Sequence, residues 1–363
     1  MSKPKEIQIS GKNYYAWGYE EQTKVKHKVL GSYAKIWISK LGYKSNTIFF
    51  DCHGGCGAYI DDKSDISYGS SILVKQIADD LSKKRSTKTG VYYCEKDKNT
   101  YDNFINIKNE LGNMKINTYN DSFENVISKP DVSKYYNNYP TLFLVDPFGY
   151  NFDINELSVM MKGFGNEVIV NFMFDFITRF ISKSELKDSF NRFFGTNEWE
   201  KAIGLTGRER ETFLVNIFKN KIKDVTGAKF VFPYRLCYPD KDQTYYYLIH
   251  ATNHIDGITL MKEAFASVNN GRVQYLGKHN NDISLLDLDC FKADEIYNSY
   301  FKNQTGKRLT VNEFWISIVE ETAYTKKDLN GVLNELVENK KIRIDRVSSK
   351  RGSYRENDVI TVL

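Results

Sequence analysis

The chain has 363 residues, more than one compact core usually holds, so we expect one large domain and one smaller domain. A hydrophobic fraction of 41% with only 6 prolines excludes a disordered protein, and the net charge of +5 mildly favours anionic partners. No run of 18 apolar residues occurs and the start MSKPKEIQIS has no apolar core, so we expect a cytoplasmic protein without a membrane span. The cysteines form an odd, scattered set, which favours reduced thiols.

The first half of the chain alternates between helical and strand patterns. Apolar residues at helical spacing predict a first helix over 23–39, ended by Gly42. Continuous apolar or β-branched runs predict strands at 47–52, 91–95, 115–119, 141–146 and 167–172. Helical patterns between them fall at 72–81, 97–111 and 155–162. Strands separated by helices predict a parallel sheet with right-handed crossovers.

The alternation ends near Thr178, and only helical patterns follow as far as Lys223. Two strands then lie close together at 229–238 and 244–252, separated by the turn sequence PDKD. Five parallel strands closed by an antiparallel hairpin are the strand inventory of the class I methyltransferase-like Rossmann fold, with a seven-stranded mixed sheet. We therefore expect this α/β domain over 1–290, with a helical insertion at about 180–228. The insertion is either a substrate-facing lid or a packing subdomain, and the sequence leaves both open.

The last 73 residues, 291–363, predict a separate winged-helix domain. A helix is expected around 314–319, and a second helix begins after Thr325, with Asp328 completing a capping box. Two strands then alternate around a basic turn. The basic residues of this hairpin are Lys340, Lys341, Arg343, Arg346, Lys350, Arg351 and Arg355. Such a hairpin fits phosphates, so we expect it to contact nucleic acid, with DNA favoured over RNA; a solvated or protein-binding wing is the alternative.

The sequence FFDCHGGCGAY at the end of the first strand predicts a cofactor site. Glycines let a backbone pass close to a nucleotide-like ligand at the mouth of a sheet. The predicted loop residues are Asp51, Gly54, Gly55, Gly57 and Tyr59. Glu95, at the end of the second strand, is placed to bind ribose, and Asp121, after the third strand, to contact adenine. Together they predict binding of S-adenosylmethionine, with a segment between 59 and 71 inserted before the next helix.

Two other phosphate- or nucleotide-binding classes fit less well. No Gly-Lys-Ser/Thr follows the glycines, which disfavours a P-loop. GGCGAY does not open a helix as G-x-G-x-x-G does, which disfavours a dehydrogenase.

These motifs resemble the three-Cys-motif partner protein (TcmP) family, whose members look like Rossmann-type methyltransferases. The resemblance covers roughly 20–265 and is carried by the glycine loop, the DPFG turn at 146–149 and the segment ATNHIDGITLMKEA at 251–264. It implies association with a phage-type partner protein bearing three clustered cysteines, in a phage or mobile-element context. The chain departs from the family at His53-Gly54, where Phe-Ala is usual, and at Ser71, where proline is usual.

The turn Asp146-Pro147-Phe148-Gly149 follows the fourth strand, at the edge where open α/β sheets hold their ligands. Amino-methyltransferases place an Asp/Asn-Pro-Pro-aromatic turn here, in which the acid binds an exocyclic amine and the ring stacks on the base. Asp146, Pro147 and Phe148 are therefore the candidate catalytic residues. The match is partial, and a structural Asp-Pro turn is the alternative. A cytosine C5 mechanism would need a thiol nucleophile near this turn, and the sequence has none there.

His250 and His254 lie four residues apart where a strand leads into a loop, so we expect packing residues and no metal site. Arg179, after the fifth strand, suits either a substrate phosphate or a local salt bridge.

Two functions follow from the sequence. The first is an S-adenosylmethionine-dependent methyltransferase acting on nucleic acid, with a base amine as the candidate acceptor. The second is a non-catalytic Rossmann and winged-helix protein that binds nucleic acid or a three-Cys-motif protein.

Overall fold

The computed structural model describes residues 4–84, 88–147, 149–271, 273–274, 293–347 and 352–363. Phe148, Lys350 and Arg351, all named above, lie outside these ranges, and so does Cys290, one of the cysteines. In the described part of the chain, no helix has the length and apolar character that a membrane span requires. Cys52, Cys56, Cys94 and Cys237 are free and buried.

A seven-stranded sheet forms the centre of the molecule. Its order is β7 (Asn117–Tyr119), β6 (Thr89–Cys94), β3 (Thr47–Asp51), β8 (Thr141–Val145), β9 (Glu167–Phe172), β11 (Thr244–Thr252) and β10 (Phe230–Cys237). The first five strands are parallel, and β11 is antiparallel to both of its neighbours. Counted along the chain, this is the order 3-2-1-4-5-7-6 of the class I methyltransferase-like Rossmann fold, so the predicted fold class is confirmed.

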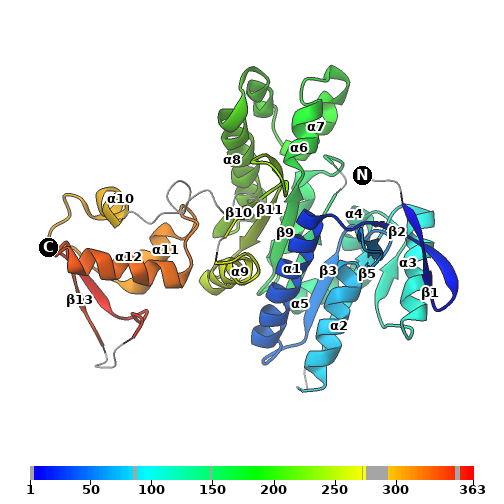
Figure 1. Cartoon of the computed structure of the whole chain (residues 1–363), viewed down its shortest axis with the longest axis horizontal. Coiled ribbons are helices and arrows are strands. Elements are labelled where there is room, and N and C mark those ends of the chain that lie inside the picture. Colours follow the sequence, from blue (N-terminus) through cyan, green and yellow to red (C-terminus); the bar gives the residue numbers. More distant parts are fainter. Residues whose placement is uncertain (1–3, 85–87, 148, 272, 275–292, 348–351) are drawn as a thin grey trace.

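Helices cover both faces of this sheet (Figure 1). The first layer consists of α1 (Glu21–Leu41), α2 (Ser70–Ser82), α3 (Lys98–Glu110) and α9 (Ile255–Val268). The second consists of α4 (Phe123–Ile127), α5 (Pro130–Asn138), the 3₁₀ segment η1 (Ile154–Lys162) and α8 (Gly207–Thr226). Successive strand residues point to opposite faces, so Phe49 packs in the first layer while Ile48 and Phe50 pack in the second. All three are buried, as a parallel sheet covered on both faces requires.

A second, four-stranded sheet contacts α3 of the first layer, where Asn103 hydrogen-bonds to the backbone of Tyr15. It pairs the N-terminal hairpin β1 (Lys5–Ile9) and β2 (Lys12–Gly18) with β4 (Ala58–Ile60) and β5 (Ile66–Tyr68). The hairpin of β4 and β5 is the predicted insertion between the glycine loop and α2. The sheet itself is not predictable locally, because β2 finds its partner, β4, about 40 residues further along the chain.

The helical insertion begins with α6 (Phe174–Phe180) and continues through η2 (Ser184–Leu186), α7 (Lys187–Phe194), η3 (Glu198–Gly204) and α8. Aromatic rings fill its interior: Phe193 stacks on Phe218, and both contact Phe172 of β9. Glu211 of α8 accepts hydrogen bonds from Arg235 (3.1 Å) and Tyr247 (2.7 Å) of the closing hairpin. The insertion therefore packs as part of the domain.

The C-terminal elements form a separate layer at one end of the molecule, beside α9 and β10 (Figure 1). They are α10 (Ala293–Ile296), η5 (Tyr297–Phe301), β12 (Arg308–Thr310), α11 (Val311–Ile318), α12 (Lys326–Glu338), β13 (Ile342–Asp345) and β14 (Val359–Val362). The strands form an antiparallel sheet in the order β12-β14-β13. The apolar stripe of α12 is buried as predicted, and Thr325 and Asp328 form the predicted capping box. The assignment of this layer as a winged-helix domain stays a prediction.

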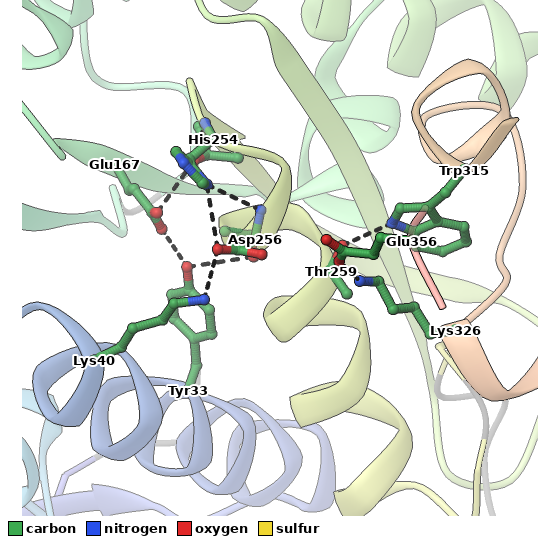
Figure 2. Close-up of polar contacts among 11 residues, drawn as sticks. Tyr33, Lys40, Glu167, His254, Asp256, Thr259, Trp315, Lys326 and Glu356 are labelled. Carbon is green, nitrogen blue, oxygen red and sulfur yellow. Dashed lines mark hydrogen bonds and ion pairs between the residues drawn. The ribbon is translucent and has the colours of Figure 1, made fainter. Parts of the chain in front are cut away.

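Buried polar contacts attach this layer to the Rossmann domain. Lys262 of α9 is fully buried and donates to the backbone oxygens of Val319 and Thr322, just beyond α11. Trp315 donates its indole N–H to Thr259 at 2.8 Å (Figure 2). Glu320 accepts from the backbone N–H of Val231 on β10 at 2.8 Å. None of these contacts can be predicted from a local sequence pattern, and the sequence analysis, which expected a loop at His254, did not predict α9.

The capping box of α12 gives a stability prediction. Thr325→Ala removes the hydroxyl that accepts from the Asp328 backbone N–H, so we expect the free energy of unfolding to fall by about 1 kcal/mol in urea titrations. Thr325→Ser keeps the hydroxyl and should lose less than half of that. Equal losses in the two variants would assign the effect to the methyl group instead of the cap.

Candidate functional site

A cavity of about 760 Å³ opens at the carboxyl ends of the parallel strands. Its walls come from the turns after β3, β6, β7 and β8, from the end of β9, from β2 and α1, and from the insertion. Of the predicted site residues, those that line it are Gly54, Gly55, Tyr59, Glu95, Asp121, Asp146 and Pro147. Residues far apart in the sequence therefore share one cavity, as the order of strands predicted.

The glycine loop leaves no room for side chains. A Cβ on Gly54 would come within 2.1 Å of the Tyr93 ring, and Tyr93 donates its hydroxyl to the backbone oxygen of Gly55 at 2.6 Å. Gly55 has a φ of +67°, and a Cβ there would lie 2.8 Å from Trp17. The departure from the TcmP pattern at position 54 thus has a local cause, because the ring of Tyr93 occupies the space of an alanine methyl group.

Glu95 lies at the end of β6 and faces the cavity. Its carboxylate accepts from the backbone N–H groups of Gly55 (3.2 Å) and Asp97 (2.8 Å), which fixes it against the glycine loop. A carboxylate has about four acceptor positions, so these bonds do not use up its capacity to accept from a ligand. Burial raises the pKa of Glu95 above its ordinary value, partly offset by these hydrogen bonds.

Asp51 and Gly57 do not line the cavity. Asp51 is fully buried and accepts from Ser70 and from Ser71 (2.8 Å) at the start of α2, while its other oxygen has no protein partner. Burial raises the pKa of Asp51 to about 6. Gly57 packs its backbone against Gly69. Both residues contact the loop and the start of α2 on the side away from the cavity. Their direct contact with a cofactor stays a prediction.

Asp121 lines the cavity after β7 and is held by Ser122, Asn125 and Lys129. The hydrogen bond from Asn125 is the largest cause that lowers the pKa of Asp121. Asn120 instead donates to the backbone oxygens of Glu95 and Lys96, so it connects the turn after β7 with the turn after β6.

Asp146 ends β8 and forms a buried ion pair with Lys26 of α1, and it accepts a hydrogen bond from Asn171 of β9. Burial alone would raise the pKa of Asp146, but the Lys26 ammonium and the hydrogen bonds outweigh it and lower that pKa. Asn171 lines the cavity, and its side-chain carbonyl oxygen is buried and has no protein partner. Pro147 also lines the cavity, whereas Phe148 lies outside the described residues.

Lys26 is a site residue that the sequence analysis missed. Its neighbours Val25, Val29 and Leu30 form the buried stripe of α1, and Lys26 lies within that stripe, which was the available signal. His27, adjacent to it, is buried against Tyr19 and Tyr59, and burial lowers its pKa to about 3.

The cavity wall is strongly acidic. Eight carboxylates line it: Glu20, Glu95, Asp97, Asp121, Glu124, Asp146, Asp153 and Glu156. Against them stand three basic side chains, Lys26, Lys96 and Arg192. Such a wall favours a cationic ligand over an anionic one. Across the described ranges, no group of three His, Cys, Asp or Glu side chains has a geometry that would hold a metal ion.

The two histidines of the 250–254 segment have separate structural roles. His250 is buried on β11 and pairs with Glu167 at 2.9 Å, and Glu167 also accepts from Tyr33, toward which it points (Figure 2). His254 caps α9, because its ring nitrogen accepts from the Asp256 backbone N–H at 3.2 Å. Arg179 makes the local salt bridge, to Asp175 at 2.7 Å, and keeps 59% of its side chain exposed.

The basic hairpin of the tail is partly neutralised. Lys341 pairs with Asp294, and Arg343 with Asp345 at 3.1 Å. Arg346 lies over the Tyr354 ring at 4.4 Å, while Lys340 and Arg355 are exposed. The preceding helix α12 carries Lys326 and Lys327 at its start but Glu335 and Glu338 near its end, so its outer face is not basic. Contact with nucleic acid through this hairpin stays a prediction.

Comparisons with known proteins identify no family. No protein family model matches the chain, and no curated protein matches it. Among solved structures, a protein of Legionella pneumophila is similar over 69% of this chain and 93% of its own, with 10% identity and a TM-score of 0.42. An rRNA methylase of Streptococcus thermophilus is similar over 64% of this chain and 96% of its own, with 10% identity and a TM-score of 0.33. At these TM-scores the similarities add nothing to the strand order, which by itself defines the fold.

The buried carboxyl of Asp51 gives a pH prediction. Its pKa of about 6 lies above the ordinary value, so the folded protein binds more protons than the unfolded chain between about pH 4 and pH 6. The contribution of Asp51 to the free energy of unfolding therefore falls as the pH rises through that window, by on the order of 2–3 kcal/mol. Asp51→Asn should remove this fall in urea unfolding measured at pH 4.5 and pH 7.5. The exposed control Asp62→Asn should keep it, and an unchanged pH profile in Asp51→Asn would contradict the assignment.

Proposed function

We propose that this protein is an S-adenosylmethionine-dependent methyltransferase acting on nucleic acid, with an exocyclic base amine as the acceptor. One observation carries the proposal: the glycine loop and Glu95 face the same cavity as Asp146. Within a class I methyltransferase-like sheet, this arrangement supports a cavity in which one wall would bind the nucleotide and another the methyl acceptor.

The cavity residues fit this cofactor. Gly54 and Gly55 line the cavity, and Tyr93 and Trp17 pack where their Cβ atoms would lie, so the loop backbone itself forms the wall that a ligand would meet. Glu95 would accept from the ribose hydroxyls, and Asp121, which lines the same cavity, would contact the adenine. Acidic walls suit a molecule that carries a sulfonium and an ammonium group. When bound, S-adenosylmethionine supplies a methyl group on that sulfonium.

Asp146 is the proposed acceptor-binding residue. The Lys26 ammonium and the Asn171 amide each occupy one side of the carboxylate and hold it in the charged form. The remaining acceptor positions are available to the N–H of an amine, whose lone pair they would orient toward the cofactor. We propose that Asn171, through its unpartnered carbonyl oxygen, accepts a second N–H of the same amine. Phe148 would stack on the base.

A non-catalytic binding protein is the second candidate. The observation that favours it is that both carboxylate oxygens of Asp146 already have protein partners. In that case the cavity binds the cofactor without turnover, and the chain acts as a partner of a three-Cys-motif protein in a phage or mobile-element complex.

Cofactor binding is tested by calorimetry with S-adenosylmethionine and S-adenosylhomocysteine. Glu95→Gln should weaken both by about 10- to 100-fold, because a charge-assisted hydrogen bond contributes about 1.5–3 kcal/mol. The matched control is Glu335→Gln, the same change on the exposed face of α12, which should leave affinity unchanged. Failure of the unchanged protein to bind either molecule would exclude the methyltransferase.

Turnover is tested with methyl-labelled S-adenosylmethionine and pooled single-stranded and duplex DNA and RNA. Asp146→Asn should lower the rate by about 100-fold or more while cofactor affinity changes less than about threefold, because the carboxylate acts on the acceptor. Lys26→Met should behave similarly, and Lys26→Arg should restore part of the rate by supplying a cation again. Cofactor binding with no transfer by the unchanged protein to any pool would favour the non-catalytic candidate.

A further inference from the structure

Three cations lie over aromatic rings on the surface formed by α6 and the turn between β10 and β11. Arg179 lies over Phe176 at 5.9 Å and Lys183 over Phe180 at 5.3 Å. Lys241 lies over Tyr238 at 4.1 Å. The three rings are all partly exposed, and all three basic residues are exposed. We call these six residues the aromatic rim.

The aromatic rim is one continuous surface because Asp175 holds its two parts together. Asp175 of α6 accepts from the Tyr238 hydroxyl at 2.9 Å and from Gln243 at 3.1 Å, and it pairs with Arg179. The α6 half and the hairpin half of the rim therefore keep a fixed relation.

The rim leads into the cavity. The ring of Tyr238 lies 4.8 Å from that of Tyr245, edge to face, and Tyr245 lines the cavity. Arg192 of α7 is exposed and also lines the cavity. Through the contact of Tyr238 with Tyr245, the hairpin part of the rim thus adjoins the cavity wall, and Arg192 adds a basic side chain to that wall.

We propose that the aromatic rim binds a single-stranded segment of nucleic acid whose target base enters the cavity. This inference rests on the proposed function and names its substrate-binding surface. Rings that stack bases, interleaved with cations that contact phosphates, are the means by which proteins bind single strands without reading sequence. A base must also leave its stack to reach a cavity of this kind, which is least costly in a single strand.

Charge separates the two parts of this surface. The acidic wall of the cavity disfavours phosphates, so the backbone of a bound strand has to remain outside it. Among the described residues, no carboxylate lies within ion-pair distance of the Lys183 or Lys241 ammonium group. The neighbouring acid Asp242 is itself paired with Arg208 and Arg235. Both lysines are therefore placed to meet phosphates.

The tail hairpin is not an equivalent candidate for this role. Figure 1 shows β13 in the C-terminal layer beside α12, away from α6, which directly follows β9. Met173, between β9 and α6, lines the cavity, so within the described part of the chain the rim is the one of these two surfaces that adjoins it.

The experiment measures binding of fluorescent 12-nucleotide single-stranded DNA and RNA to the full chain by anisotropy, at several salt concentrations. The double variant Lys183→Gln/Lys241→Gln removes two phosphate contacts. We expect affinity to fall about tenfold and the slope of log K against log salt to become shallower by about 1.4, or about 0.7 for each contact. The matched control Lys44→Gln/Lys115→Gln changes two exposed lysines away from the rim and should alter neither.

A ring test separates stacking from charge. Tyr238→Phe keeps the ring and loses only the hydroxyl bond to Asp175, so binding should stay within about threefold of the unchanged protein. Tyr238→Leu removes the ring and should weaken binding about tenfold. Unchanged S-adenosylmethionine affinity in each variant shows that the fold and the cofactor site remain intact.

The outcomes distinguish this inference from the proposed function. Cofactor binding together with strand binding that is unaffected by the rim variants overturns the rim and leaves the methyltransferase standing. Equal competition by polyglutamate, which has the charge but no bases, also overturns it, as does preference for duplex over single strand. Absence of cofactor binding instead removes the proposed function, whatever the rim does.

Discussion

The buried pair between Lys26 and Asp146 is the interaction on which the site depends. Two charges held this far from solvent are stable only with close geometry and further hydrogen bonds, which Asn171 supplies. The pair connects α1 with the ends of β8 and β9, so it also fixes this part of the cavity wall. The Asp146 carboxylate is thereby held charged and in one position.

Charge and aromatic rings are distributed unevenly around this pair. Acidic walls enclose the cavity, and basic side chains over rings begin at its margin. The helical insertion provides both its own packed interior and part of this margin, through α6 and Arg192. The two interpretations that the sequence left open, packing subdomain and substrate-facing surface, are therefore compatible, because the same short helices bury one face and expose the other.

The sequence predicted most of the Rossmann domain because its signals are local. Buried parallel strands are continuous apolar runs, and the helices between them show apolar residues at helical spacing, so each element is recognisable by itself. The capping box at Thr325 was recognisable for the same reason, since it needs only four residues. The pairing of β2 with β4 was not recognisable, because the two strands lie far apart in the sequence, and neither was α9, which begins at a histidine cap that resembles a loop residue.

For the site, sequence alone determined the residues at the strand ends, because the carboxyl ends of parallel strands always meet at one edge. Gly54, Gly55, Glu95, Asp121 and Asp146 reach one cavity on that ground. Only the tertiary structure decided what those residues contact. It placed Lys26 against Asp146 across 120 residues and Tyr93 over the glycine loop, and it turned Asp51 away from the cavity toward α2. The reason is that burial and ion pairing depend on which elements pack together, and a local sequence pattern does not show which elements do.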